Sequence, residues 1–151
     1  MKRKSITLAV TAFSALAAVS SQGAVLITQY YEGPSTNKWI EITNTDTTSV
    51  DLGTLNYKLS HFNNSGAEGY KTSVTPFATL NLTGTLASGA SFLYGNTANT
   101  TPTYATATAT SNTVINFNGN DSIALWTGTT FATSSIVDAI GFTNAGIEGV
   151  D

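Results

Sequence analysis

The feature that most limits the fold is a run of short segments between residues 24 and 60 in which apolar and polar residues alternate. The clearest segment is 38–43, where Ile40 and Ile42 share one face and Glu41 lies on the other. A period of two places successive side chains on opposite faces of a β-strand. Comparable segments recur along the chain, separated by clusters of Gly, Asn, Asp or Pro, and no helical period follows the N-terminal segment. The pattern predicts an all-β sandwich.

The breaks between these segments predict where the strands end. Gly53 interrupts the third segment, and Pro76 marks the fourth as an edge strand or a bulge, because proline cannot donate to a ladder. Asn-Gly at 118–119 favours a two-residue turn, so residues 114–126 are predicted to form a hairpin. Residues 97–112 suit a weak edge strand or a loose loop, and the loop is favoured. The predicted strands are 25–31, 38–43, 50–62, 70–82, 91–94, 114–117, 122–126 and 136–142, the last as an inner strand.

The first 23 residues have the composition of a secretory signal peptide. Residues 2–4 are basic, residues 6–19 are apolar and uncharged, and small residues precede Ala24. A bilayer span needs about 20 apolar residues, so an uncut membrane anchor is the weaker alternative. The sequence predicts cleavage after residue 23, a mature chain without a membrane span, and a location that is secreted, cell-surface or periplasmic.

Charge and cysteine content exclude several classes of function. Three of the six basic residues lie in the predicted signal peptide, which leaves three lysines and no arginine against nine acids in residues 24–151. A protein that binds a phosphate backbone needs clustered Lys or Arg, so nucleic acid is not an expected partner. With no cysteine and one histidine, the chain is expected to hold no disulfide, no metal and no cofactor. Residues 24–151 are long enough for one domain.

Several short motifs follow one another in a recognisable order. The strongest is Trp-Ile-Glu-Ile-Thr-Asn at 39–44, followed by Val-Asp-Leu-Gly at 50–53 and a Leu-Ala-Ser-Gly turn at 86–89. Residues 117–125 and the Val-Asp-Ala-Ile-Gly at 137–141 complete the series. In this order the motifs resemble lamin-tail domains of the secreted bacterial type, which implies an immunoglobulin-like β-sandwich over residues 24–151. The resemblance implies structural roles for Trp39, Glu41, Asn44, Asp51, Asp121 and Asp138.

The resemblance also bears on the end of the chain and on its role. The family usually has one more strand after the segment that corresponds to 137–141, so we expect a missing last strand and a C-terminally truncated domain. An unpaired sheet edge is a template for association, so such a chain is expected to be marginally stable or to self-associate. Lamin-tail domains often accompany enzymes or surface modules in exported bacterial proteins. We therefore expect a module of a longer protein, with no catalytic residues of its own.

Candidate reactive side chains are few. His61 ends a predicted strand, and because the chain has no Gly-x-Ser-x-Gly elbow, His61 is predicted to be a half-exposed strand residue. Glu41 and Asp138 lie in strands, where a buried carboxylate must be hydrogen-bonded. We predict that both bond backbone or hydroxyl groups; a ligand role for Glu41 is the alternative. Residues 118–122 carry oxygen atoms that suit Ca²⁺ but lack spaced acids, so a turn is predicted there.

The aromatic residues distinguish two kinds of function. An exposed, coplanar row of them would favour a carbohydrate-binding module, whereas burial would favour a non-catalytic module for protein or surface interaction. We expect the second function, with a protein or a cell-surface polymer as partner. An accessory domain of an extracellular hydrolase is a third reading. The aromatic residues considered are Tyr30, Tyr31, Tyr70, Tyr94, Tyr104 and Trp126.

Overall fold

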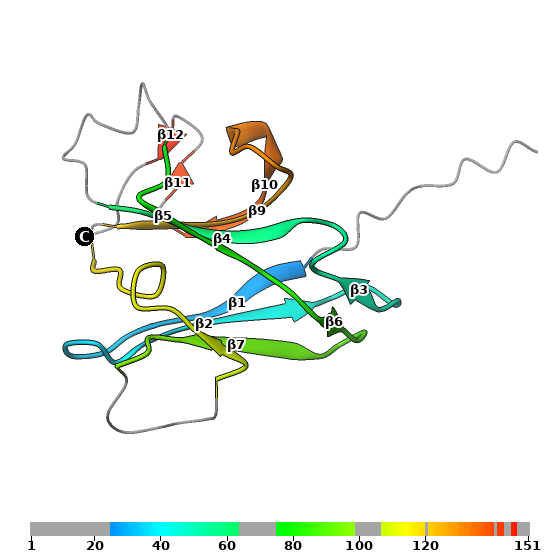
Figure 1. The fold of residues 1–151 in the computed structure, drawn as a ribbon, viewed down its shortest axis with the longest axis horizontal. Coiled ribbons are helices and arrows are strands. Elements are labelled where there is room, and N and C mark those ends of the chain that lie inside the picture. Colours follow the sequence, from blue (N-terminus) through cyan, green and yellow to red (C-terminus); the bar gives the residue numbers. More distant parts are fainter. Residues whose placement is uncertain are drawn as a thin grey trace, which may run out of the picture.

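A computed structural model describes residues 25–63, 75–98, 107–119, 121–140, 142–143 and 146–147. Two four-stranded sheets form two layers, one above the other in Figure 1. Within the described ranges, no helix has both the length and the apolar character that crossing a membrane requires. The predicted signal peptide and the terminal residues 148–151 lie outside the described residues.

The first sheet contains the motif strand. Its order is β1-β2-β7-β8, with β1 (Val25–Glu32), β2 (Lys38–Asn44), β7 (Ser91–Gly95) and β8 (Ala109–Thr110). β2 is antiparallel to both neighbours, and Ile40 faces Tyr94 across the β2–β7 ladder. The register of β1 shifts between Ile27 and Gln29, which is a β-bulge. β8 pairs parallel to β7, so the end of the predicted loop 97–112 is a short edge strand.

The second sheet has the order β10-β9-β4-β5. Its strands are β4 (Tyr57–Phe62), β5 (Ala78–Asn81), β9 (Ser122–Thr127) and β10 (Ile136–Ile140). β5 lies at the edge of the sheet, just after Pro76, as the proline predicts. The 3₁₀ turn η2 (Thr133–Ser135) lies in the connection between β9 and β10.

Two small strand pairs complete the described elements. β3 (Val50–Asp51) pairs with β6 (Thr85–Leu86), and β11 (Phe142–Thr143) pairs with β12 (Gly146–Ile147). The predicted strand 50–62 is therefore two strands, β3 and β4, with a turn between them.

The main core lies between the two sheets. Alternate residues of each strand enter it, so Ile40 and Ile42 from β2 meet Leu59 and Leu125 from the opposite sheet in one cluster. All four side chains are fully buried. Burying such side chains supplies about 1.5–3 kcal/mol each. The predicted all-β, immunoglobulin-like sandwich is confirmed.

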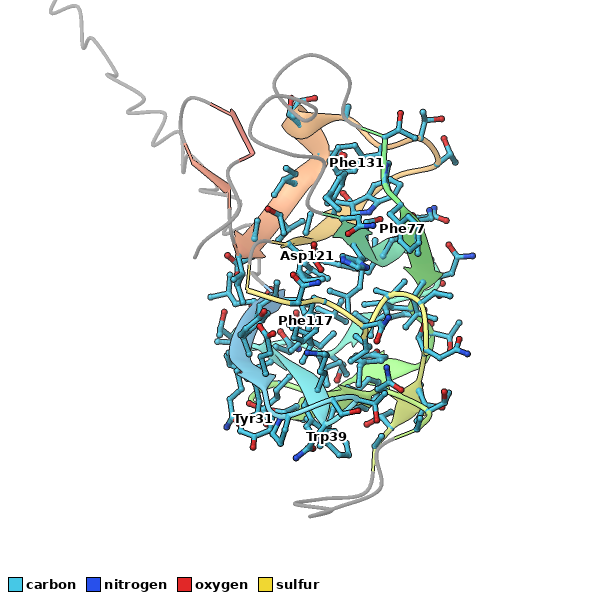
Figure 2. All side chains as sticks on the ribbon, turned by 90° about the vertical axis from the view of Figure 1, so that its left-hand side faces the viewer. Tyr31, Trp39, Phe77, Phe117, Asp121 and Phe131 are labelled. Carbon is cyan, nitrogen blue, oxygen red and sulfur yellow. The ribbon has the colours of Figure 1, made fainter. Side chains whose placement is uncertain are left out.

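A second, smaller cluster covers the outer face of the second sheet. Phe62, Ala124 and Trp126 point away from the main core and are buried, and Phe131 from the β9–β10 connection packs on them. The Phe131 ring meets Trp126 edge-on at 5.3 Å between centroids. Figure 2 shows Phe131 on the far side of the upper layer from Phe117, which lies between the sheets.

The predicted hairpin at 114–126 is wrong. Residues 111–118 contain no strand, and β9 pairs with β4 and β10. Val114, Ile115 and Phe117 are nevertheless buried in the core. Side chains replace the missing ladder: Asn96 Nδ2 donates to the Ile115 carbonyl at 2.6 Å, and Ser111 Oγ accepts from the Val114 amide at 3.1 Å. An apolar run can therefore be buried here without a strand partner.

Two predictions about the C-terminal segment also need correction. β10 is an edge strand and not an inner one: Val137 packs on the main core, while Ile136 and Ala139 pack on the outer cluster. Partial burial of both faces explains why apolar residues occupy both odd and even positions of β10. The segment after β10 was expected to hold no strand, yet the structure pairs β11 with β12.

Candidate functional site

Glu41 lies on the outer face of the first sheet, not between the sheets. Thr28 lies at the β1 bulge, and its Oγ1 donates to Glu41 Oε1 at 2.7 Å. The Thr28 hydroxyl also lies 2.7 Å from that of Thr43, which in turn lies 2.7 Å from the Ser91 hydroxyl. Glu41 thus belongs to a row of hydroxyl groups that links three strands, and it is only partly buried.

Trp39 and Asn44 lie at the two ends of β2. Trp39 is buried, and its Nε1–H donates to Asn37 Oδ1 at 3.0 Å. Asn44 is fully buried, and its side chain makes three hydrogen bonds. Its amide nitrogen donates to the Thr48 and Leu86 carbonyls at 2.8 and 3.0 Å, and its oxygen accepts from the Asp46 amide at 2.9 Å. Asn44 therefore ties the turn after β2 to β6.

Asp51 and Asp138 each hold backbone amides. Asp51 is exposed and accepts from the Thr54 amide at 2.9 Å, which stabilises the turn after β3. Asp138 Oδ2 accepts from the Ile27 amide of the other sheet at 2.8 Å, and Oδ1 accepts from the Ala139 amide at the same distance. The Asp138 carboxylate therefore joins the edges of the two sheets.

The prediction that His61 is half-exposed is wrong. Its side chain is buried, and Nε2 lies 2.9 Å from Asp121 Oδ2, which is also buried. His61 Nδ1 lies 3.1 Å from the Thr113 carbonyl, so both ring nitrogens face acceptors. Asp121 Oδ2 also accepts from the Asn118 amide at 2.8 Å and closes the predicted turn. With both sides enclosed, the pair ties β4 to the segment before β9 and offers no surface for a substrate.

A lysine–carboxylate pair, in which the lysine is buried and the glutamate is exposed, supports the start of β2. Lys38 Nζ lies 3.3 Å from Glu32 Oε1 and 5.7 Å from the Phe117 ring centroid. Phe117 stacks on Tyr30, and the Tyr30 hydroxyl donates to Glu32 Oε2 at 2.9 Å. Burial, and then the nearby Glu32 carboxylate, raise the pKa of Tyr30 well above its ordinary value. These contacts make the cluster a structural one.

The described aromatic residues do not form an exposed platform. Trp126 and Tyr94 are buried, and burial raises the pKa of Tyr94 to about 12. Tyr30 packs on Phe117, and Tyr31 is 36 % exposed on the outer side of the first sheet, near Trp39 in Figure 2. Tyr70 and Tyr104 lie outside the described residues. In the parts of the chain that are described, no three His, Cys, Asp or Glu residues are grouped as metal ligands would be.

The structure also contains a groove of about 510 Å³, partly open to solvent, that was not predicted from the sequence. Its lining residues come from the β3–β4 turn, β4, the end of β5 and the β9–β10 connection. Tyr57 and Leu82 underlie it and are nearly fully buried. Its lining residues are Gly53, Asn56, Tyr57, Lys58, Asn81, Leu82, Thr83 and Thr129. We call it the Lys58 groove.

Most of the polar lining of the Lys58 groove is available to a ligand. The side chains of Asn56, Asn81, Thr83 and Thr129 are exposed, and within the described residues none of them makes a hydrogen bond. Lys58 is half-buried: Nζ donates to the Gly128 carbonyl and lies 4.9 Å from the Trp126 ring centroid. The groove can therefore bind a ligand through Lys58, which two contacts hold in place, and through the four exposed side chains, which are free to form hydrogen bonds.

The comparisons with known proteins agree with this architecture. The sequence model of the lamin tail domain family matches residues 18–144. A search of curated proteins gave no match. The matched range contains every described strand as far as β11, including the β2 motif and the Asp121 and Asp138 segments. The chain belongs to the lamin tail domain family.

Proposed function

We propose that this chain is an exported, non-catalytic module that binds a protein or a cell-surface polymer. The observation that carries the proposal is the contrast between the buried and the exposed polar groups. The His61–Asp121 pair is enclosed and hydrogen-bonded internally, whereas the amides and hydroxyls of the Lys58 groove face solvent without protein partners in the described residues. The groove is therefore suited to recognition.

The export part of the proposal rests on the sequence of residues 1–23. A basic start, an uncharged apolar run and small residues before Ala24 are the three parts of a secretory signal. Because the chain contains no cysteine, its stability outside the cell or in the periplasm would rest on its apolar core and not on disulfides.

A carbohydrate-binding module is the second candidate, and one observation favours it. Two amides and two hydroxyls converge in the Lys58 groove, and such groups pair well with the hydroxyls of a sugar. The burial of Trp126 and Tyr94 argues against binding to a flat crystalline polysaccharide through stacked rings. A glycan bound here would be recognised mainly through hydrogen bonds.

The test expresses the full chain in a Gram-negative host and examines the exported fraction. We expect the exported protein to begin at or within a few residues of Ala24. It should bind immobilised polymers or proteins reversibly, and it should turn over no peptide, ester, glycoside or nucleic-acid substrate. Turnover that Glu41→Gln abolishes without unfolding the chain would refute the non-catalytic role. An intact Met1 in the membrane fraction would refute export.

A further inference from the structure

The Lys58 ammonium is held in place without a carboxylate partner among the described residues. Its Nζ donates to the Gly128 carbonyl and lies over the Trp126 ring, so the position of the charge is set by two contacts. Lys38, the other lysine in the described part of the chain, is paired with Glu32. An ammonium has three N–H donors, and one of them is used by Gly128. Lys58 therefore offers positive charge and hydrogen-bond donors to a ligand.

Gly128 links the two sides of the Lys58 groove. Its carbonyl accepts from Lys58, and its amide donates to the Asn56 carbonyl at 3.2 Å. Gly128 has a φ of 114°, which a residue with a Cβ rarely adopts, and Asn56 has a φ of 53°, which asparagine tolerates. These two backbone positions fix the β3–β4 turn against the β9–β10 connection. The groove is preorganised by hydrogen bonds and does not rely on a ligand to form.

Neutral hydrogen-bonding groups surround the ammonium. Asn81 faces Lys58 across the β4–β5 ladder, and Thr83, Thr129 and Asn56 complete the lining. Each amide offers a donor and an acceptor, and each hydroxyl offers both. A ring that carries several hydroxyls and one carboxylate would match this set. The volume of about 510 Å³ lies within the range of small-ligand sites, and because the groove is partly open to solvent, a polymer chain can extend beyond the bound unit.

From this arrangement we infer that the Lys58 groove binds a uronic acid unit of an acidic polysaccharide. Lys58 receives the carboxylate, and the four neutral side chains receive the ring hydroxyls. A peptide fits less well, because Tyr57 and Leu82 are 6 % and 2 % exposed and leave no apolar pocket for an anchor side chain. The inference rests on the proposed binding function and names the ligand class of its groove.

A phosphate group is a poorer match than a carboxylate. Asp51 lies near the Gly53 end of the groove, where its Oδ1 is 3.5 Å from the position that a Cβ on Gly53 would take. The groove offers one ammonium, and the Asp51 carboxylate lies only at its Gly53 end, so its single positive charge matches a singly charged sugar acid better than a doubly charged phosphate.

The test measures the affinity of the full exported chain for trigalacturonate and for its methyl ester by titration calorimetry. The two ligands share their rings and differ in charge. We expect the acid to bind about tenfold more tightly than the ester, and Lys58→Met to remove that preference, because a hydrogen bond to a charged group is lost. The double variant Asn81→Ala/Thr83→Ala should lower the affinity for both ligands. Asn63→Ala, an exposed amide at the opposite end of β4, is the matched control and should change neither.

Each other outcome overturns the inference. Equal affinity for acid and ester, or an acid preference that survives in Lys58→Met, would exclude Lys58 as the carboxylate site. If Lys58→Met unfolds, the exposed Asn81→Ala/Thr83→Ala variant decides, and unchanged affinity would exclude the groove. If N-acetylated triaspartate binds as tightly as trigalacturonate, the groove recognises acidic peptides and the inference fails. If the chain binds neither sugar yet still binds other polymers or proteins, the proposed function stands and this inference fails.

Discussion

Replacing Asp121 with alanine is expected to lower the free energy of unfolding by about 4 kcal/mol. The substitution leaves His61 buried without its carboxylate partner and leaves the Asn118 amide without its acceptor. Breaking a buried pair by removing one member is costly because the other remains out of water and unpaired. Folded domains are usually stable by about 5–15 kcal/mol, so this loss would be a large fraction of the free energy of unfolding.

Urea unfolding of the full chain, followed by tryptophan fluorescence, measures this loss. Asp51→Ala is the matched control: it removes an exposed carboxylate with one backbone contact, and we expect a loss of about 1 kcal/mol or less. A double-mutant cycle with His61→Ala should give a coupling energy of about 2 kcal/mol. Equal losses for Asp121→Ala and Asp51→Ala would contradict the structural role of the pair.

Asn44→Ala is expected to destabilise the chain by about 3 kcal/mol. Asn44 is fully buried, and its loss would leave the Thr48 and Leu86 carbonyls and the Asp46 amide without the bonds they make to it. The Leu86 carbonyl belongs to β6, which pairs with β3, so the substitution should also loosen that strand pair.

The same unfolding measurement, combined with hydrogen exchange, separates these two effects. Amides of β3 and β6 should exchange faster in Asn44→Ala than in the native chain. Asn81→Ala removes an amide of the same kind that is exposed and makes no hydrogen bond in the described residues, so it should leave both stability and exchange unchanged. A native-like unfolding midpoint for Asn44→Ala would refute the account of this residue.

The positions of the strands could be predicted from the sequence wherever one face of a strand is buried and the other is exposed to solvent. In β2, Ile40 and Ile42 enter the core, while Glu41 and Thr43 join the outer hydroxyl row, so the period of two is visible in the sequence. The pattern misled where both faces are covered, as in β10, or where side chains satisfy the backbone in place of a ladder, as at 111–118. The alternation of apolar and polar residues indicates which side chains are buried, and it indicates strand pairing only indirectly.

The sites could not be predicted because their members are far apart in the chain. His61 and Asp121 are separated by 60 positions, and no local pattern links a lone histidine to a particular carboxylate. The Lys58 groove combines three connections, and only the turn-forming Asn56 and Gly128 carry a local signal. The type of each residue shows which hydrogen bonds its side chain can make. Its partner depends on the order of the strands in the sheets, which the sequence does not show locally.

An NMR titration of the ¹⁵N-labelled full chain with trigalacturonate tests most directly whether this lamin tail domain is a binding module that uses the Lys58 groove. We predict that the largest amide shifts occur at residues 53–58, 81–83 and 128–129, with no change in the ligand spectrum over time. Largest shifts near the exposed side chains of Tyr31 or Phe77, with the Lys58 groove unchanged, would contradict the account, as would hydrolysis of the ligand.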